Sequence, residues 1–179
     1  MHKTSHISLA SIHARPAYVE AVLNQLTHRK IPLFFRDERQ VDSRVVLEGL
    51  TQGTLGSNVF YEVLLKEAIT RVVGIVAVQK PATKESPAYI SFLLIDADFR
   101  GRGLGHDVIL LLDKELAQFS DTILLHVSPP SPSLIAFWQS NGFATVDGLQ
   151  EIVGVDQTKH TGALMQKRLH TTASLELLH

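Results

Sequence analysis

The segment IDADFRGRGLGHDVILLLDKEL, from Ile95 to Leu116, decides how the rest of the sequence is interpreted. In it an apolar run ends at a charged corner, three alternating glycines follow, and apolar residues then return at helical spacing. The first N–H groups of a helix have no partner within the helix, and its dipole adds partial positive charge there. Glycines leave this backbone open to a ligand, and Arg100 and Arg102 add cationic side chains. The segment therefore predicts an anion site, for a phosphate or a pyrophosphate.

Two common phosphate-binding loops fit this segment poorly. A Walker loop closes with Gly-Lys-Ser/Thr, whereas this segment closes with Gly105-His106-Asp107, which disfavours nucleotide hydrolysis. A dinucleotide fingerprint requires Gly-x-Gly-x-x-Gly, but here the third glycine comes one position early and His106 takes its place. Asp121 lies at about the right distance for a ribose-binding acid, yet it precedes the next expected strand instead of ending it. A glycine turn that binds nothing stays open as an alternative.

Composition narrows the class of protein. The chain has 179 residues, enough for one domain with a substantial core and few for two. A net charge of −1 offers no basic field for nucleic acid or an anionic membrane. The absence of cysteine excludes disulfides, thiolate zinc sites and a cysteine nucleophile, and the histidines are not spaced as zinc ligands, so we expect no metal. Without a membrane-length apolar run or a signal peptide, the expected location is cytoplasmic.

Apolar periodicity predicts one mixed α/β domain over residues 1–170 and a tail at 171–179. The elements expected before the glycine corner are a strand at 6–12, a helix from Pro16 with the apolar stripe Tyr18, Val22 and Leu26, a short helix capped by Asp42 or Ser43, a hairpin of strands 58–66 and 71–80, and a strand at 88–95. The second hairpin strand is apolar on both faces, which predicts a place inside the sheet.

The elements expected after the corner continue the alternation of helix and strand. They are a helix over 106–119 with Val108, Ile109, Leu112, Leu116 and Phe119 on one face, a strand at 121–127, a helix within 133–143 closed by Asn141-Gly142 in left-handed geometry, and a strand pair at 143–149 and 163–169. An exposed sheet edge near the C-terminus would allow a homodimer.

Two motifs, in this order, resemble the GNAT superfamily of acyl-CoA-dependent N-acetyltransferases. Arg100-Gly101-Arg102-Gly103-Leu104-Gly105 is similar to the family's Arg/Gln-x-x-Gly-x-Gly/Ala loop, and AFWQSNGF (136–143) resembles its second motif. The order of expected elements also resembles the family over nearly the whole chain. The resemblance implies a mixed sheet of about six to seven strands, flanked by helices and splayed between the fourth and fifth strands.

The resemblance also implies a binding site for coenzyme A. In this family the loop N–H groups hold the pyrophosphate, which corresponds here to Arg100 through Gly105. The backbone of the fourth strand binds the pantetheine arm, a role that would fall to Leu94, Ile95 and Ala97, with the N–H near Ile95 as oxyanion donor. Ser133 stands where many members carry an asparagine that touches the cofactor.

Trp138 departs from the pattern of the family. Many members have at this position a tyrosine whose phenol protonates the departing thiolate, and an indole N–H is not a usable acid. Water or another residue could protonate the thiolate, the acid could lie elsewhere, or the domain could be catalytically idle. We expect Trp138 to pack in the core or against the pantetheine.

Three residues are candidates for the base that must deprotonate an amine before it attacks a thioester. Glu62 lies on the expected hairpin and faces either the central cleft or solvent. Tyr89 and Ser91 lie two apart on one strand and so share a face. His126 ends the strand 121–127, where ligands gather in open α/β sheets, and imidazole titrates near neutral pH. A purely structural role is the alternative for each.

The resemblance therefore implies an N-acetyltransferase that moves the acetyl group of acetyl-CoA directly to a primary amine, on a small molecule or a peptide. The region 36–58 would form part of the acceptor side, and its acids (Asp37, Glu38, Asp42 and Glu48) suit a cationic amine or are plain surface charge. An idle acyl-CoA-binding sensor or interaction module is the alternative that Trp138 favours. A nucleotide-binding domain is a further alternative.

Overall fold

The computed structural model describes residues 7–12, 16–27, 43–51, 58–67, 69–128, 130–154 and 158–169. Within them a mixed seven-stranded sheet has the order β1-β2-β3-β4-β5-β7-β6. The strands are β1 (Ile7–Ile12), β2 (Asn58–Leu65), β3 (Arg71–Gln79), β4 (Ala88–Ile95), β5 (Thr122–Val127), β6 (Ala144–Val153) and β7 (Lys159–Arg168). The helices are α1 (Pro16–Thr27), α2 (Ser43–Thr51), α3 (Leu104–Leu116), α4 (Pro132–Ser140) and the short 3-10 helix η2 (Ala97–Phe99). The expected mixed α/β fold is confirmed.

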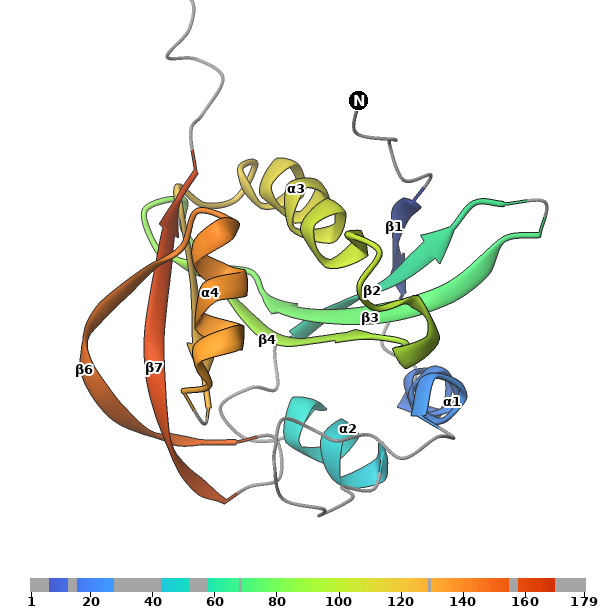
Figure 1. The fold of residues 1–179 in the computed structure, drawn as a ribbon, viewed down its shortest axis with the longest axis horizontal. Helices are drawn as coiled ribbons and strands as arrows, with labels where there is room; N and C mark the ends of the chain where they lie inside the picture. The colour runs from blue at the N-terminus through green and yellow to red at the C-terminus, as the bar shows by residue number, and fades with distance from the viewer. Residues whose placement is uncertain are drawn as a thin grey trace, which may run out of the picture.

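Helices cover both faces of the sheet, with α3 on one side of the central strands and α1 and α2 on the other (Figure 1). The larger buried cluster joins α3 and α4 to the sheet, and the second cluster joins α1 and α2 to the other face. The sequence pattern of β3 fits this arrangement, because its Val76 belongs to the first cluster and its Ile75 to the second. β3 lies between β2 and β4, as its two apolar faces predict.

The parallel strands β4 and β5 separate soon after they begin. Among the described residues they pair at Ala88 with Ile123 and at Tyr89 with Leu124, and no further pair follows. The other neighbours of these strands continue their ladders, since β3 pairs with β4 as far as Ile95. The opening between the remaining parts of β4 and β5 is called the splay below. The splayed sheet expected from the sequence is confirmed.

A β-bulge interrupts β4 beside the splay. The register with β3 shifts between Ala77 and Val78, which leaves Ser91 as the extra residue. Ile90 before it belongs to the cluster under α3, whereas Phe92 after it belongs to the cluster under α1 and α2. The simple alternation that predicts a shared face for Ser91 and the tyrosine two residues earlier is therefore interrupted here.

Two details of the helices differ from expectation. Tyr18 is 46% exposed, and the buried face of α1 instead carries Val19, Val22, Leu23 and Leu26. The reason is that the Tyr18 hydroxyl donates to Glu62 Oε1 on β2, so its side chain does not join the apolar face. Phe119 is 37% exposed because α3 ends at Leu116, before the phenylalanine could extend its apolar face.

The C-terminal elements agree with expectation, apart from one backbone conformation. The last strand pair is confirmed, with β6 longer than predicted. Gly142 after α4 has φ +87°, the expected left-handed form, whereas Asn141 has φ −97° and does not. The cap proposed at Asp42, the acids Asp37 and Glu38, and the tail 171–179 lie outside the described residues, so the boundaries of the domain stay a prediction. No helix in the described ranges is long and apolar enough to cross a membrane.

Candidate functional site

The glycine corner lies at the wide end of the splay, where β4 leads through η2 into α3. Asp98 N–H donates to Asp96 Oδ1 at 2.9 Å, which caps η2. The Arg100 Nε–H donates to the carbonyl oxygen of Ile95 at 2.8 Å and so ties the corner back to the end of β4. Arg102 is exposed, with its guanidinium carbon 5.1 Å from the centre of the Phe99 ring. The two arginines therefore differ: one is partly structural and the other is the more available cation.

The glycines of the corner have two different functions. Gly101 and Gly103 have φ of +71° and +81°, a left-handed backbone that glycine adopts without strain. A Cβ added to either would meet no atom within 4 Å, so open space lies over both. A Cβ on Gly105 would instead lie 3.1 Å from the Phe137 ring of α4. Gly105 is thus needed for helix packing, whereas Gly101 and Gly103 leave the backbone accessible.

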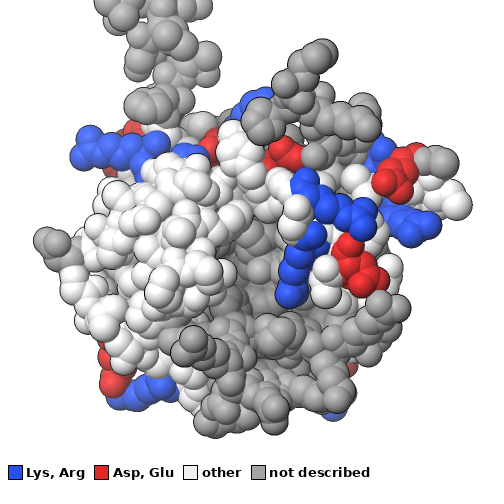
Figure 2. All heavy atoms as spheres, in the orientation of Figure 1, with Lys and Arg blue, Asp and Glu red and all other residues white. Residues whose placement is uncertain are grey.

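The N-terminus of α3 presents free donors toward the same place. Gly103 is the N-cap, and the first bond into the helix runs from Asp107 N–H to the Gly103 carbonyl at 3.2 Å. The N–H groups of the first helical residues therefore have no intrahelical acceptor. The Leu104 side chain is buried in the core, so this residue can offer a ligand its backbone alone. Figure 2 shows basic side chains over the region where β4 runs into α3, which makes it suitable for an anion.

The edge of β4 that faces the splay has no strand partner beyond Tyr89. Of the residues expected to line it, Leu94 is buried through its side chain, Ile95 is partly buried and Ala97 is exposed on η2. Unpaired N–H and C=O groups along a strand edge form a template for an extended, amide-containing ligand. Ser91 adds a polar atom, because its buried Oγ has no hydrogen-bond partner among the described residues.

Ser120 holds the closed end of the splay together. Its side chain is fully buried, and its Oγ accepts from the N–H groups of Ala88 and Thr122, both at 3.1 Å. The same hydroxyl can donate to the carbonyl oxygen of Ser86 or of Thr122, each 2.8 Å away. Because Ala88 begins β4 and Thr122 begins β5, one hydroxyl joins the two strands where their pairing starts. Nothing in the sequence marks this residue, since a serine before a strand is common.

Tyr89 and His126 bridge the splay next to this closed end. The Tyr89 hydroxyl lies 2.7 Å from His126 Nδ1, and His126 Nε2 lies 3.2 Å from Gln150 Oε1 on β6. An amide oxygen accepts hydrogen bonds, so Nε2 carries the proton and Nδ1 accepts from the phenol. The structure therefore brings together two of the three base candidates. Nothing in the sequence distinguishes Gln150, because a glutamine on a strand is common.

Burial raises the pKa of the Tyr89 phenol to about 12, well above its usual value near 10. An interaction with the backbone of His126, separate from the bond to Nδ1, opposes this effect on the pKa and is the smaller cause. Tyr89 therefore stays protonated across the neutral range, and its hydroxyl can donate to the imidazole. A phenol in this state can pass a proton onward only if it receives another in exchange.

The third base candidate, Glu62, lies elsewhere on the sheet. It is 6% exposed and its Oε1 accepts from the Tyr18 hydroxyl at 2.6 Å. It pairs with Ile75 of β3, which in turn pairs with Leu94 of β4. Tyr89 lies five residues before Leu94 on β4, roughly 15 Å along the strand at the usual rise per residue. The same hydrogen bond to Glu62 is the main cause that raises the pKa of the Tyr18 phenol above its ordinary value.

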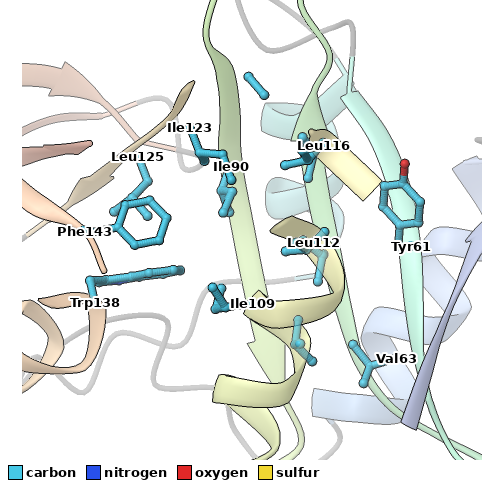
Figure 3. Packing of buried hydrophobic residues seen from close by; sticks show 14 of the residues in the cluster. Tyr61, Val63, Ile90, Ile109, Leu112, Leu116, Ile123, Leu125, Trp138 and Phe143 are labelled. Atoms are coloured by element: carbon cyan, nitrogen blue, oxygen red, sulfur yellow. The ribbon is translucent and has the colours of Figure 1, made fainter. Parts of the chain in front are cut away.

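The two residues expected on α4 lie in different surroundings. Ser133 is exposed on the first turn, and its Oγ lies 2.9 Å from Ser131 Oγ. Trp138 is 9% exposed and packs edge-on against Phe137 and Phe143, with ring centres 5.1 and 5.2 Å apart. Figure 3 shows Trp138 and Phe143 together in the core beneath the sheet. Trp138 is therefore a packing residue of the larger buried cluster.

The corner and the second motif of the sequence contact each other. His106 Nδ1–H donates to Asn141 Oδ1 at 2.7 Å, and Asn141 Nδ2 donates to the Phe137 carbonyl at 2.7 Å. Phe137 also packs against Gly105. The start of α3 and the end of α4 are therefore fixed to one another.

Comparison with known proteins agrees with this geometry. Residues 28–143 match the model of the acetyltransferase (GNAT) family. None of the curated protein sequences matches the chain significantly.

Several solved acetyltransferase structures share the fold. The ribosomal-protein-S18-alanine N-acetyltransferase from Escherichia coli has a TM-score of 0.64 at 14% identity, over 93% of this chain and 96% of that one. An acetyltransferase from Thermus thermophilus has a TM-score of 0.64 at 21% identity, over 94% of this chain and 100% of that one. A spermidine N-acetyltransferase chimera from Vibrio cholerae and hSSAT has a TM-score of 0.62 at 18% identity, over 98% of this chain and 100% of that one. At these identities the likeness concerns the fold.

Proposed function

The chain belongs to the acetyltransferase (GNAT) family, and on that basis we propose that it is an N-acetyltransferase that transfers the acetyl group of acetyl-CoA directly to a primary amine. The observation that carries the proposal is the splay itself. Its wide end meets free helix N–H groups and arginines, its side is an unpaired strand edge, and its closed end carries a hydrogen-bonded tyrosine–histidine pair. One extended ligand with an anionic end, an amide-containing arm and a reactive tip matches these features in order.

Coenzyme A fits the residues that the splay offers. We assign its pyrophosphate to the backbone of Gly101–Gly105, with Arg102 as the nearby cation. The open space over Gly101 and Gly103 supports this, because a bulky anion needs room against the backbone. The pantetheine amides would bond the free edge of β4 near Leu94 and Ile95. Ser133 and Trp138 would border the ligand from α4. When bound, acetyl-CoA supplies an activated acetyl thioester.

The Tyr89–His126 pair is suited to remove the proton from the attacking amine. An alkylammonium has a pKa near ~10.4, so about one amine in a thousand is free at neutral pH. His126 Nδ1 can take the phenol proton while the phenol oxygen takes one from the ammonium, so Tyr89 stays neutral throughout. His126 then releases a proton at Nε2, beside the exposed Gln150. Base catalysis of this kind contributes roughly 10²–10⁴-fold.

Glu62 is a less suitable base in this scheme, because it lies far from the closed end and is already bonded by Tyr18. Its role in the proposal is to hold α1 against β2. No residue is assigned to protonate the departing thiolate, since the Trp138 indole cannot supply a proton. The ammonium nitrogen loses two protons in the overall reaction, so one is released to solvent and the other is available to the thiolate through water.

The acceptor is proposed by class only, as a primary amine on a small molecule or a peptide. We also propose that the exposed edge of β6, with Leu149 63% and Val153 53% exposed, is a contact between two copies of the chain.

Calorimetric titration with acetyl-CoA, CoA, ATP and NAD tests the site. The proposal expects heat from the two CoA ligands and none from NAD. Gly103→Asp should lower the affinity for acetyl-CoA by at least about tenfold, because it adds a carboxylate beside the pyrophosphate. Gly103→Asn has the same size and backbone strain without the charge and should keep most of the affinity. Gly148→Asp repeats the charge at another open glycine of positive φ, on β6, as a control.

Release of thiol from acetyl-CoA with a broad panel of amines tests the activity. Release that depends on the amine and disappears in Gly103→Asp supports the proposal. Tight binding of acetyl-CoA with no thiol release for any amine would instead support the idle acyl-CoA-binding module that Trp138 favours. ATP that competes with CoA would point to a nucleotide site.

A further inference from the structure

We infer that Ile90 and Leu125 form a stop at the closed end of the splay that limits the acyl group of the thioester to acetyl. This inference rests on the proposed function. It concerns a different part of the site from the anion-binding corner, and it assigns to two core residues the selection among acyl-CoA substrates.

The position of the two residues follows from the strand pairing. β4 and β5 last pair at Tyr89 with Leu124, so the next residues along, Ile90 and Leu125, are the first on either side of the opening. Both side chains lie on the face that α3 and α4 cover, with 5% and 2% of their surface exposed. Figure 3 shows Ile90 next to Ile123 of β5, and Leu125 next to Phe143. A chain that enters the splay from the wide end reaches these two residues last, where the strands come together.

The buried side chains behind Ile90 and Leu125 are closely packed. Ile90 and Leu125 belong to one buried cluster with Ile123, Trp138 and Phe143. Trp138 and Phe143 contact each other edge to face, with ring centres 5.2 Å apart. Cores of this kind have no spare volume for an added methylene, and forcing one in displaces side chains from their preferred rotamers. Each carbon beyond the acetyl methyl would therefore have to displace core atoms.

The opposite face of the closed end is blocked as well. The Tyr89–His126 hydrogen bond spans the two strands there at 2.7 Å. Ser120 fixes the spacing of the strand ends by bonding the N–H groups of both. A longer acyl chain can neither pass the polar bridge nor spread the strands without breaking these bonds. The closed end thus presents an apolar wall on one face and the proposed base on the other.

Removing volume at the stop should change which acyl group is accepted. Ile90→Val removes one methyl group and Ile90→Ala removes three carbons, so the two variants form a graded pair. Affinity for CoA, acetyl-CoA, propionyl-CoA and butyryl-CoA is measured by calorimetry for each protein. The kcat/KM of the three acyl-CoA substrates is then measured with the same amine. In the wild type, acetyl-CoA should exceed butyryl-CoA by at least about tenfold, as one methylene in a tight pocket typically costs that much.

Ile90→Ala should raise the ratio of butyryl-CoA to acetyl-CoA, in affinity and in kcat/KM, by about tenfold or more. Ile90→Val should raise the ratio for propionyl-CoA and not for butyryl-CoA. Leu116→Ala is the matched control, because Leu116 is fully buried in the same cluster but lies on α3, away from the splay. It should lower stability and leave the ratios unchanged.

The outcomes separate this inference from the proposed function. Wild-type protein that binds CoA, acetyl-CoA and butyryl-CoA equally well overturns the stop and leaves the CoA site intact. Ratios that stay the same in both Ile90 variants, or that change equally in Leu116→Ala, also overturn it. Wild-type protein that binds none of these ligands overturns the CoA site itself. If Ile90→Ala does not fold, Ile90→Val with propionyl-CoA still decides the question.

Discussion

The two ends of the splay are built by different means, although they serve the same proposed ligand. At the wide end the important groups are backbone N–H groups, held by glycines of positive φ at the surface. At the closed end they are buried side chains, with Ser120 joining the strands and Tyr89 bonded to His126. Substitutions of exposed side chains at the wide end should therefore change ligand affinity and leave stability nearly intact. Substitutions at the closed end should change turnover or stability.

The largest effect is expected at Tyr89. Tyr89→Phe removes the hydroxyl that links the amine to His126, and kcat should fall by about 100-fold with little change in the affinity for acetyl-CoA. His126→Gln should cause a similar loss, and the double variant should be no worse than either one, because the two residues act as a unit. Tyr61→Phe is the control, since Tyr61 is also buried but bonds Glu115 outside the splay. Equal activity of Tyr89→Phe and the wild type would contradict the assigned role.

The raised pKa of Tyr89 predicts a pH dependence of stability. The folded protein holds the phenol proton up to about pH 12, whereas the unfolded chain releases it near the ordinary pKa of about 10. This contribution to the free energy of unfolding is complete below pH 10 and is lost as pH rises toward 12. Urea unfolding at several pH values in this window should show a steeper loss for the wild type than for Tyr89→Phe. Parallel curves would mean that the phenol is not protected by burial.

Ser120→Ala tests the closed end as a structural element. It leaves the N–H groups of Ala88 and Thr122 without their acceptor, which should lower the free energy of unfolding by about 1–3 kcal/mol. Amide hydrogen exchange should speed up at Ala88 and Thr122 before it does elsewhere in β4 and β5. Ser131→Ala, at a partly exposed serine before α4, should leave stability nearly unchanged. An unchanged unfolding midpoint for Ser120→Ala would mean that strand pairing alone closes the splay.

Arg102→Gln tests the wide end by charge alone. Loss of the exposed cation should lower the affinity for acetyl-CoA by about fivefold to tenfold and reduce the salt dependence of binding. It should not lower the stability of the protein. Arg168→Gln removes an exposed arginine at the end of β7 and should have no effect on affinity. If both variants weaken binding equally, the effect is one of net charge, and the corner has no special role.

The smallest effect is expected at a surface ion pair beside the closed end. Lys84 and Asp121 lie 3.8 Å apart with about half of each side chain exposed, so Lys84→Met should change stability by no more than about 0.5 kcal/mol. The backbone bond from Asp121 N–H to the Lys84 carbonyl does not depend on the side chain. Thermal unfolding measured beside Ser120→Ala would show whether the buried hydroxyl, and not the ion pair, closes the splay.

The difference between the two ends also explains how far the sequence could predict the site. The wide end is visible in the sequence, because its chemistry requires glycines at fixed spacing before an apolar helix. The strands and helices were equally visible from their apolar periods, and Trp138 was correctly expected to pack in the core. The closed end depends on residues that meet only after folding, such as Tyr89 and His126. The sequence indicates both as candidate bases, but it does not predict the hydrogen bond between them.

Particular differences from the sequence prediction have particular physical causes. Gly105 is predicted to be part of the ligand site, and the structure adds a second need for a glycine there, because a Cβ would lie 3.1 Å from the Phe137 ring. The alternation through Ser91 failed because a bulge adds one residue, and bulges have no reliable local pattern. The position of Tyr18 predicts a place on the apolar face of α1, but its hydroxyl donates to Glu62 and the side chain stays exposed.

The contact of Phe137 with Gly105 has a consequence for how this chain could be altered. The glycine corner and the second motif lie about thirty residues apart, but the phenylalanine ring and the His106–Asn141 hydrogen bond join them. A larger residue at position 105 would require a smaller one at position 137, so the two positions should be inherited together. A corner transplanted from a relative would need its own partner helix, and the two segments are best exchanged as one cassette.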